Sequence, residues 1–194
     1  MSDPTERPVE TPTAQPGTVP RSRPRVRPGV RLGVDVGSVR VGLAASDPDG
    51  RLAMPVETVA REPEDSAGGA VPADVQRVVE HVRRLDAIEV VVGLPRSLDG
   101  SEGPAARAAR AYAEMITRAA GPVPVRLVDE RLTTVSAHRS LHEAGRLGHR
   151  QRSVVDQVAA VTILQSALDG ERSQAAPPGE LVGRPGATRK RRTK

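Results

Sequence analysis

Cysteine, tryptophan and phenylalanine are absent from this chain of 194 residues, and tyrosine occurs once. Without cysteine the chain can form no disulfide and offers no thiolate nucleophile, which is typical of a reducing compartment. Because aromatic side chains are almost missing, a nucleic-acid-binding surface of stacked aromatic rings is excluded. The core must be built from valine, leucine, isoleucine and alanine.

Long apolar runs are also missing. No segment approaches the roughly 20 apolar residues that span a bilayer, and the N-terminal segment lacks the apolar centre of a secretory signal. We therefore expect a cytoplasmic protein. The length suits one domain with tails.

The formal net charge of +5 is concentrated at the two ends of the chain. Residues 1–31 carry six arginines and three acids, and residues 171–194 carry seven basic and two acidic residues. The remaining segment has 16 basic and 19 acidic residues, a net charge of −3. The basic ends could attract a polyanion or be solvated arms.

Composition divides the chain into three parts. Residues 1–29 are rich in proline, threonine and arginine and cannot bury enough apolar surface to fold, so we expect a disordered tail. Residues 171–194 have a similar character. Residues 30–170 are expected to form the folded domain.

The hydrophobic pattern of this domain predicts the order β-β-β-α-β-α-β-α-α. The turn Asp47-Pro48-Asp49-Gly50 joins two strands in a hairpin, and Pro55 indicates that the third strand lies at an edge. The later strands alternate with helices, which favours parallel pairing. Strands are expected at 30–36, 39–46, 52–59, 88–92 and 123–128, and helices at 73–85, 104–119, 133–144 and 153–168.

One carboxylate, Asp35, lies inside the first apolar strand. A strand interior disfavours aspartate, because a buried unpaired charge is costly. Two explanations are open: the carboxylate binds a cation, or it accepts hydrogen bonds from the turn at Gly37-Ser38.

Further acids follow other apolar segments. Asp129 and Glu130 end a buried strand, where they could bind metal or pair with arginine. Asp156 lies near the start of an apolar helix, where it could bind metal or form a capping pair with Ser153. In open α/β sheets ligands gather at the carboxyl ends of the strands. Three carboxylates there suit Mg²⁺, and two such ions are a common device for phosphodiester hydrolysis.

Four motifs in this order resemble the YqgF/RuvX family, the pre-16S rRNA nucleases that are also called Holliday junction resolvases. The resemblance covers about residues 31–170 and implies a ribonuclease H-like fold: a mixed five-stranded sheet, with a three-strand antiparallel meander and then two parallel strands, flanked by helices. The motifs are GVDVGSVRVG at 33–42, VGLP through Gly100 at 92–100, DERLTT at 129–134 and DQVAA at 156–160.

The resemblance also implies a metal-dependent phosphodiester hydrolase with an acidic triad. By position the triad would be Asp35, Glu130 and Asp156, with Mg²⁺ or Mn²⁺ as the cofactor. Asp129 remains an alternative to Glu130, because adjacent strand residues point to opposite faces.

The implied activity is trimming of the 5′ end of pre-16S rRNA in ribosome biogenesis, with ribosomal precursor particles as partners. The alternative is resolution of branched DNA, which would require a symmetric dimer because two strands are cut. The sequence alone fits a monomer or a homodimer. It leaves open whether cleavage is endonucleolytic or exonucleolytic.

Basic side chains near the predicted site could bind phosphates, or they could form a solvated face. These candidates are Arg40, Arg96, Arg131, Arg139, Arg146, Arg150 and Arg152.

The sequence leaves two other classes of function open. The Asp-x-Gly turn also resembles the phosphate-binding turn of ATP-binding proteins of the actin and sugar-kinase type, but that class closes two such domains around a nucleotide. A non-catalytic rRNA or ribosome-assembly factor would keep the fold and bind through its basic tails.

Overall fold

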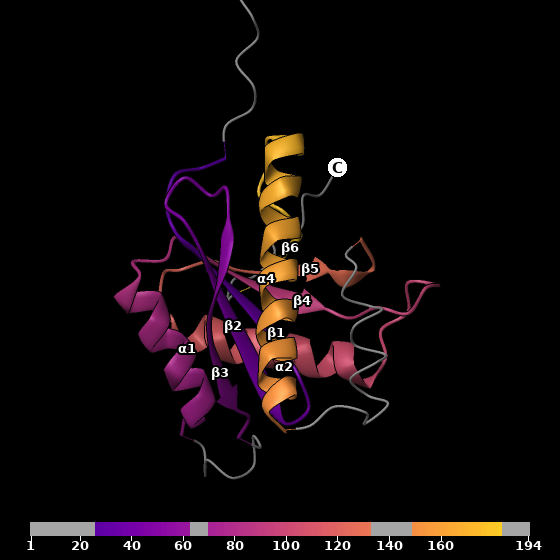
Figure 1. The fold of residues 1–194 in the computed structure, drawn as a ribbon. Coiled ribbons are helices and arrows are strands. Elements are labelled where there is room, and N and C mark those ends of the chain that lie inside the picture. Colours follow the sequence, from indigo (N-terminus) through magenta and orange to yellow (C-terminus); the bar gives the residue numbers. More distant parts are fainter. Residues whose placement is uncertain (1–25, 63–69, 133–148, 184–194) are drawn as a thin grey trace, which may run out of the picture.

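Six strands form one mixed sheet in the residues that the computed structural model describes, which are 26–62, 70–132 and 149–183 (Figure 1). The strands are β1 (Arg31–Val36), β2 (Arg40–Ser46), β3 (Ala53–Ala60), β4 (Glu89–Leu94), β5 (Val125–Asp129) and β6 (Glu180–Leu181). The helices of these residues are α1 (Ala73–Arg84), α2 (Pro104–Ala119), the short 3-10 helix η2 (Glu130–Leu132) and α4 (His149–Gln174).

The strand order is β3-β2-β1-β4-β5-β6. The first three strands form an antiparallel meander, and β4 and β5 continue the sheet in parallel with β1. This is the predicted ribonuclease H-like arrangement, and Pro55 lies in the edge strand β3 as expected. The predicted count of five strands is wrong by one, because β6 pairs antiparallel with the outer edge of β5.

Helices cover both faces of the sheet, as Figure 1 shows with α4 in front and α1 and α2 behind. Along β1, Leu32, Val34 and Val36 belong to the apolar core formed with α1 and α2. Because side chains alternate along a strand, Gly33 and Asp35 face the opposite side, toward α4. A second apolar core lies there, between the sheet and α4.

Small residues let α4 approach the sheet closely. A Cβ atom at Gly33 would lie 2.7 Å from the Cβ of Leu164 and 3.1 Å from the backbone oxygen of Ala160, so a larger residue would push the helix outward. Arg31, at the start of β1, contacts Glu171 near the end of α4. The helix therefore runs antiparallel to β1, and its N-terminal end lies beside the β1–β2 turn (Figure 1).

A buried ion network fixes the other end of α4. Glu171 accepts hydrogen bonds from Arg27 at 2.8 Å and from Arg31 at 3.1 Å. Arg27 also pairs with Glu89 at 2.7 Å, and Arg126 pairs with the same carboxylate at 2.7 Å. Both glutamates are almost fully buried, so each depends on its arginine partners.

The ordered structure extends past both predicted domain limits. Arg27 precedes residue 30, and α4 continues through Gly170 to Gln174 before β6 follows. The helix also begins at His149, earlier than the predicted residue 153. Residues 1–25, 184–194 and the predicted helix 133–144 lie outside the described residues, so those expectations remain predictions. In the described part of the chain, no helix has the length and apolar character needed to cross a membrane.

Candidate functional site

Asp35 lies near the carboxyl end of β1, on the sheet face that α4 covers. It is opposite Gly42 in the antiparallel register with β2, and its exposed fraction is 7%. The structure therefore places Asp35 where the sequence predicted, in a buried strand ending at a tight turn.

The turn after Asp35 is held from two sides. Gly37 N donates a hydrogen bond to the backbone oxygen of Arg40 at 2.9 Å, and a Cβ at Gly37 would lie 2.7 Å from that oxygen. Arg61 donates to the Gly37 carbonyl oxygen at 2.8 Å, and its guanidinium lies 5.7 Å from the centre of the Tyr112 ring. Arg61 was missed by sequence reasoning, because no local pattern signals a contact between separate segments.

Asp129 ends β5 and Glu130 begins η2, and the two side chains lie in different environments. Leu127 belongs to the core with α1 and α2, so alternation turns Asp129 toward that side. Glu130 begins η2, and its carboxylate lies over Gly93 on the face of α4, where Ile163 is also close. Glu130 is 3% exposed. Asp129 instead pairs with Arg131 at 2.7 Å. Of these two acids, only Glu130 shares a face with Asp35.

Gly93 brings Glu130 close to Asp35. In the parallel register Val34 is opposite Val92, so Asp35 and Gly93 lie at the same level on neighbouring strands, about 4.8 Å apart. The Glu130 carboxylate occupies the space above Gly93, where a Cβ atom would lie 3.2 Å from Glu130 Cδ and overlap Oε1. Glu130 begins η2, after β5, and its carboxylate therefore lies over the strand next to β1, at the level of Asp35.

Asp156 lies in α4, one helical turn before Ala160, which packs over Gly33. Because α4 runs antiparallel to β1, that turn leads from the level of Gly33 toward the level of Asp35. Ser153 and Asp156 lie inside α4, which begins at His149, so they are not a capping pair at its first turn. The side chain of Asp156 lies outside the described part of the structure.

The donor set is compatible with a divalent metal. Two buried carboxylates on one face supply the oxygen ligands that Mg²⁺ and Mn²⁺ prefer. Among the side chains that the structure describes, no group of three or more histidines, cysteines or acids could hold a metal ion. The backbone of α4 brings residue 156 toward this edge.

The predicted phosphate contacts Arg96 and Arg131 lie on either side of Asp129. Arg131 binds Asp129 through several hydrogen bonds, and Arg96 lies 3.8 Å from the same carboxylate. Hydrogen bonds from Arg131 lower the pKa of Asp129 and raise that of Arg131. Asp129 therefore holds two arginines by ion pairing near the carboxyl ends of β4 and β5.

Other acids and bases continue this ion-pair chain away from the sheet edge. Glu102 pairs with Arg96 at 2.8 Å and with Arg110 at 2.7 Å, and Arg110 in turn pairs with Glu180 of β6 at 2.9 Å. Hydrogen bonds from Arg110, and then from Arg96, lower the pKa of Glu102 to about 2. The network links the loop after β4 to α2 and β6.

The remaining predicted phosphate contacts are only partly described. Arg40 begins β2, and alternation places it on the same face as Gly42 and Asp35. Arg139 and Arg146 lie outside the described residues. Arg150 and Arg152 lie in α4, but their side chains are not described. The proposed basic surface around these residues therefore stays a prediction.

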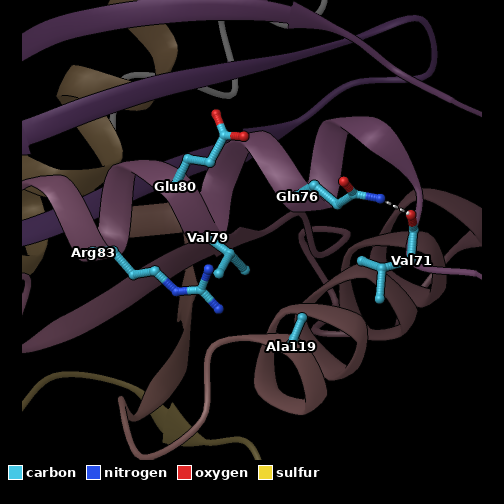
Figure 2. Close-up of a pocket in the computed structure, with 6 residues that line it drawn as sticks. All are labelled: Val71, Gln76, Val79, Glu80, Arg83 and Ala119. Atoms are coloured by element: carbon cyan, nitrogen blue, oxygen red, sulfur yellow. Dashed lines mark hydrogen bonds between the residues drawn. The ribbon is translucent and has the colours of Figure 1, made fainter.

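A separate pocket lies between α1 and α2, behind the sheet (Figure 2). Its volume is about 330 Å³, and Gln76 borders it while donating a hydrogen bond to the Val71 carbonyl oxygen at 2.6 Å. Because α1 and α2 cover the face opposite α4, this pocket does not contact the carboxylates. Its lining residues are Val71, Gln76, Val79, Glu80, Arg83 and Ala119.

The mixed sheet and the two buried carboxylates at its carboxyl edge are the arrangement expected of a ribonuclease H-like nuclease. The model of the RuvX family, described as Holliday junction resolvase, matches residues 29–170. This chain belongs to the RuvX family, whose members are nucleases and hence phosphodiester hydrolases.

Similar proteins cover most of the chain. A Kineococcus radiotolerans protein is 56% identical over 158 residues, covering 81% of this chain and 80% of that protein. A Streptomyces coelicolor protein is 53% identical over 148 residues, covering 76% and 84%. Both are named "Putative pre-16S rRNA nuclease". A solved structure of Thermus thermophilus RuvC with a Holliday junction substrate aligns at 20% identity and a TM-score of 0.48, covering 77% of this chain and 99% of that one.

Proposed function

We propose that this protein is a metal-dependent nuclease that processes the 5′ end of pre-16S rRNA. Asp35, Glu130 and Asp156 are its proposed metal ligands. The observation that carries the proposal is the adjacency of two buried carboxylates, Asp35 and Glu130, on the face of the sheet covered by α4. The names of the relatives support pre-16S rRNA as the substrate.

The carboxylates of Asp35 and Glu130 make this edge of the sheet negatively charged. A phosphodiester, which is also negative, can bind there only if positive charge is present. Mg²⁺ or Mn²⁺ bound there would activate the attacking water and stabilise the leaving oxygen. Asp35 is fixed by the ladder between β1 and β2, and Glu130 by its position over Gly93. Arg40, Arg96 and Arg131 are proposed to hold the phosphates on either side of the scissile bond. This role would place the protein with ribosomal precursor particles in the cytoplasm.

Cleavage of a 5′-extended 16S rRNA precursor tests this proposal. The full chain should cleave it in Mg²⁺ or Mn²⁺, EDTA should stop cleavage, and Asp35→Asn should abolish it. Asp49→Asn is a matched control, because the Asp49 carboxylate is 68% exposed in a surface turn. Cleavage by Asp35→Asn at the unmodified rate would overturn the site assignment. Expressing both forms in cells depleted of the protein then tests the role in rRNA maturation.

Resolution of branched DNA is the second candidate, favoured by the description of the matching family model. It predicts paired cuts in a synthetic four-way junction and a dimer in solution, because two strands must be cut. Cleavage of the rRNA precursor and of the four-way junction, measured under the same conditions, decides between the two substrates.

A non-catalytic assembly factor predicts a different result when the basic C-terminal segment is removed. Residues 184–194 contain six basic and no acidic residues. If binding depends on them, their deletion should abolish RNA binding. In the nuclease, cleavage should persist with a weaker dependence of affinity on salt, because fewer counterions are released.

A further inference from the structure

Gly93 lies inside β4 and faces α4, at the level of Asp35 on the neighbouring strand β1. A glycine within a buried strand weakens that strand and often marks a close approach of another group. Here the approaching group is the Glu130 carboxylate, which comes from η2, just after the neighbouring strand β5, and lies over Gly93. The position is fully buried within β4 and has an ordinary backbone, so no positive φ angle requires glycine.

Two side chains fill the space that a larger residue would need. A Cβ atom at position 93 would overlap Glu130 Oε1 and lie 2.6 Å from Ile163 Cδ1. Both are the ends of flexible side chains, so the backbone can remain in place while these atoms move. To restore ordinary contact distances, the carboxylate would have to shift by about 1 Å.

We propose that Gly93 is a positioning residue of the site: its missing side chain lets Glu130, the first residue of η2, extend over β4 and place its carboxylate beside Asp35. The inference rests on the proposed function, because it assumes that these two carboxylates act together on a metal. It goes further by assigning a role to a residue that touches neither metal nor substrate. The position of the Glu130 carboxylate then depends on the absence of a side chain at position 93.

The primary test is Gly93→Ala, with Mn²⁺ affinity and cleavage as separate measurements. A shift of about 1 Å in a catalytic group can lower the rate about a hundredfold. We expect kcat to fall by that order with little change in KM for RNA, and Mn²⁺ affinity to fall about tenfold. Gly170→Ala is the neutral control, because a Cβ at Gly170 meets nothing within 4 Å.

A double variant separates the two contacts. Ile163→Val removes the Cδ1 atom that the new Cβ would meet, but it leaves the overlap with Glu130. If Gly93→Ala acts by displacing Glu130, then Gly93→Ala/Ile163→Val remains as impaired as the single variant. Recovery of cleavage in the double variant, or unchanged cleavage in Gly93→Ala, overturns the proposal.

A relocated carboxylate keeps the proposal testable if Gly93→Ala does not fold. In Gly93→Asp/Glu130→Ala, the carboxyl carbon of the new aspartate lies about 1.5 Å beyond the Cβ that now overlaps Glu130 Oε1. It should restore Mn²⁺ affinity and cleavage at least tenfold above Glu130→Ala. A folded double variant no better than Glu130→Ala counts against the proposal.

These measurements also distinguish this inference from the proposed function. If the unmodified protein binds Mn²⁺ but cleaves no nucleic acid, the nuclease proposal fails while the effect of Gly93→Ala on affinity still tests the positioning role. If the Gly93→Ala variant cleaves at the rate of the unmodified protein, the nuclease proposal stands and the positioning role fails. A crystal structure of Gly93→Ala gives a third readout, the position of the Glu130 carboxylate.

Discussion

Asp129 and Glu130 are consecutive in the chain, yet their side chains leave the end of β5 on opposite faces of the sheet. Glu130 turns toward α4 and lies over Gly93, whereas Asp129 turns away and binds Arg131. Two neighbouring acids of similar chemistry therefore have different predicted roles, and single substitutions should separate them.

Glu130→Gln should lower cleavage about a hundredfold or more, because even partners of metal ligands contribute up to about that factor. Asp129→Asn is the matched control. It loosens Arg131 and Arg96, and each of these partly exposed pairs contributes about 1 kcal/mol or less, so cleavage should fall by no more than about tenfold. Single-turnover cleavage with saturating enzyme measures both. Equal losses in the two variants would contradict the assignment of Glu130 as the ligand.

The buried network at the end of α4 should contribute strongly to stability. Glu171→Ala leaves the guanidinium of Arg31, which is 1% exposed, without its carboxylate partner, and such a loss costs about 3–5 kcal/mol. Asp169→Ala, in the same helix, removes an exposed ion pair with Arg172 and should cost about 1 kcal/mol or less. Urea unfolding followed by circular dichroism gives both free energies. Similar values would show that the network adds no more than a surface pair.

Arg61 should affect the turn beside Asp35 without contacting substrate. Arg61→Met removes the hydrogen bond to the Gly37 carbonyl oxygen and the charge above Tyr112, at a cost of about 1–2 kcal/mol. Because the turn follows a proposed ligand, kcat should fall more than KM rises, and Arg61→Lys should restore part of the loss. Arg51→Met is the control, since Arg51 is 76% exposed and lies 3.7 Å from its partner. Parallel losses in both variants would exclude a specific role for Arg61.

Glu102 should make stability depend on acid pH. Its pKa falls from 4.5 to about 2 because Arg110, and then Arg96, donate hydrogen bonds to the carboxylate. A folded-state pKa below the unfolded value gives a contribution that is present above about pH 4.5 and is lost as the pH falls toward 2. The free energy of unfolding of Glu102→Gln should therefore decline less steeply than that of the unmodified protein between pH 5 and 2. Identical slopes in urea titrations across this range would contradict the prediction.

Much of the fold was predictable because the strong signals are local. The apolar runs, the Asp47–Gly50 turn and Pro55 predicted the strand order and the edge strand, and both are observed. The last helix was expected to end at residue 168, yet α4 continues to Gln174, and Glu171 in this extension is bound by Arg27 and Arg31. Such long-range pairing overrides local propensity. Strand β6 has only two residues, too few for any alternating pattern.

The candidate site was predictable by residue type but not by geometry. Both faces of β5 are covered, so alternation alone showed that Asp129 and Glu130 diverge without showing which one turns toward Asp35. A glycine at position 93, inside an apolar run, was a usable signal of close approach. The group that fills that space is the Glu130 carboxylate, which extends over from the residue after the neighbouring strand β5. No local pattern in the sequence encodes that contact.

The ion network around Glu171 and the proposed site lie at opposite ends of α4. A small rotation of the helix at the network would therefore displace the end near the site. From residue 171 to residue 156 the helix axis extends about 22 Å, at 1.5 Å per residue. A rotation of about 3° at the network would move the backbone at Asp156 by about 1 Å, a displacement that matters for catalysis. The Arg27–Glu171 contact and the apolar packing of α4 on the sheet together fix the position of the helix end that carries Asp156.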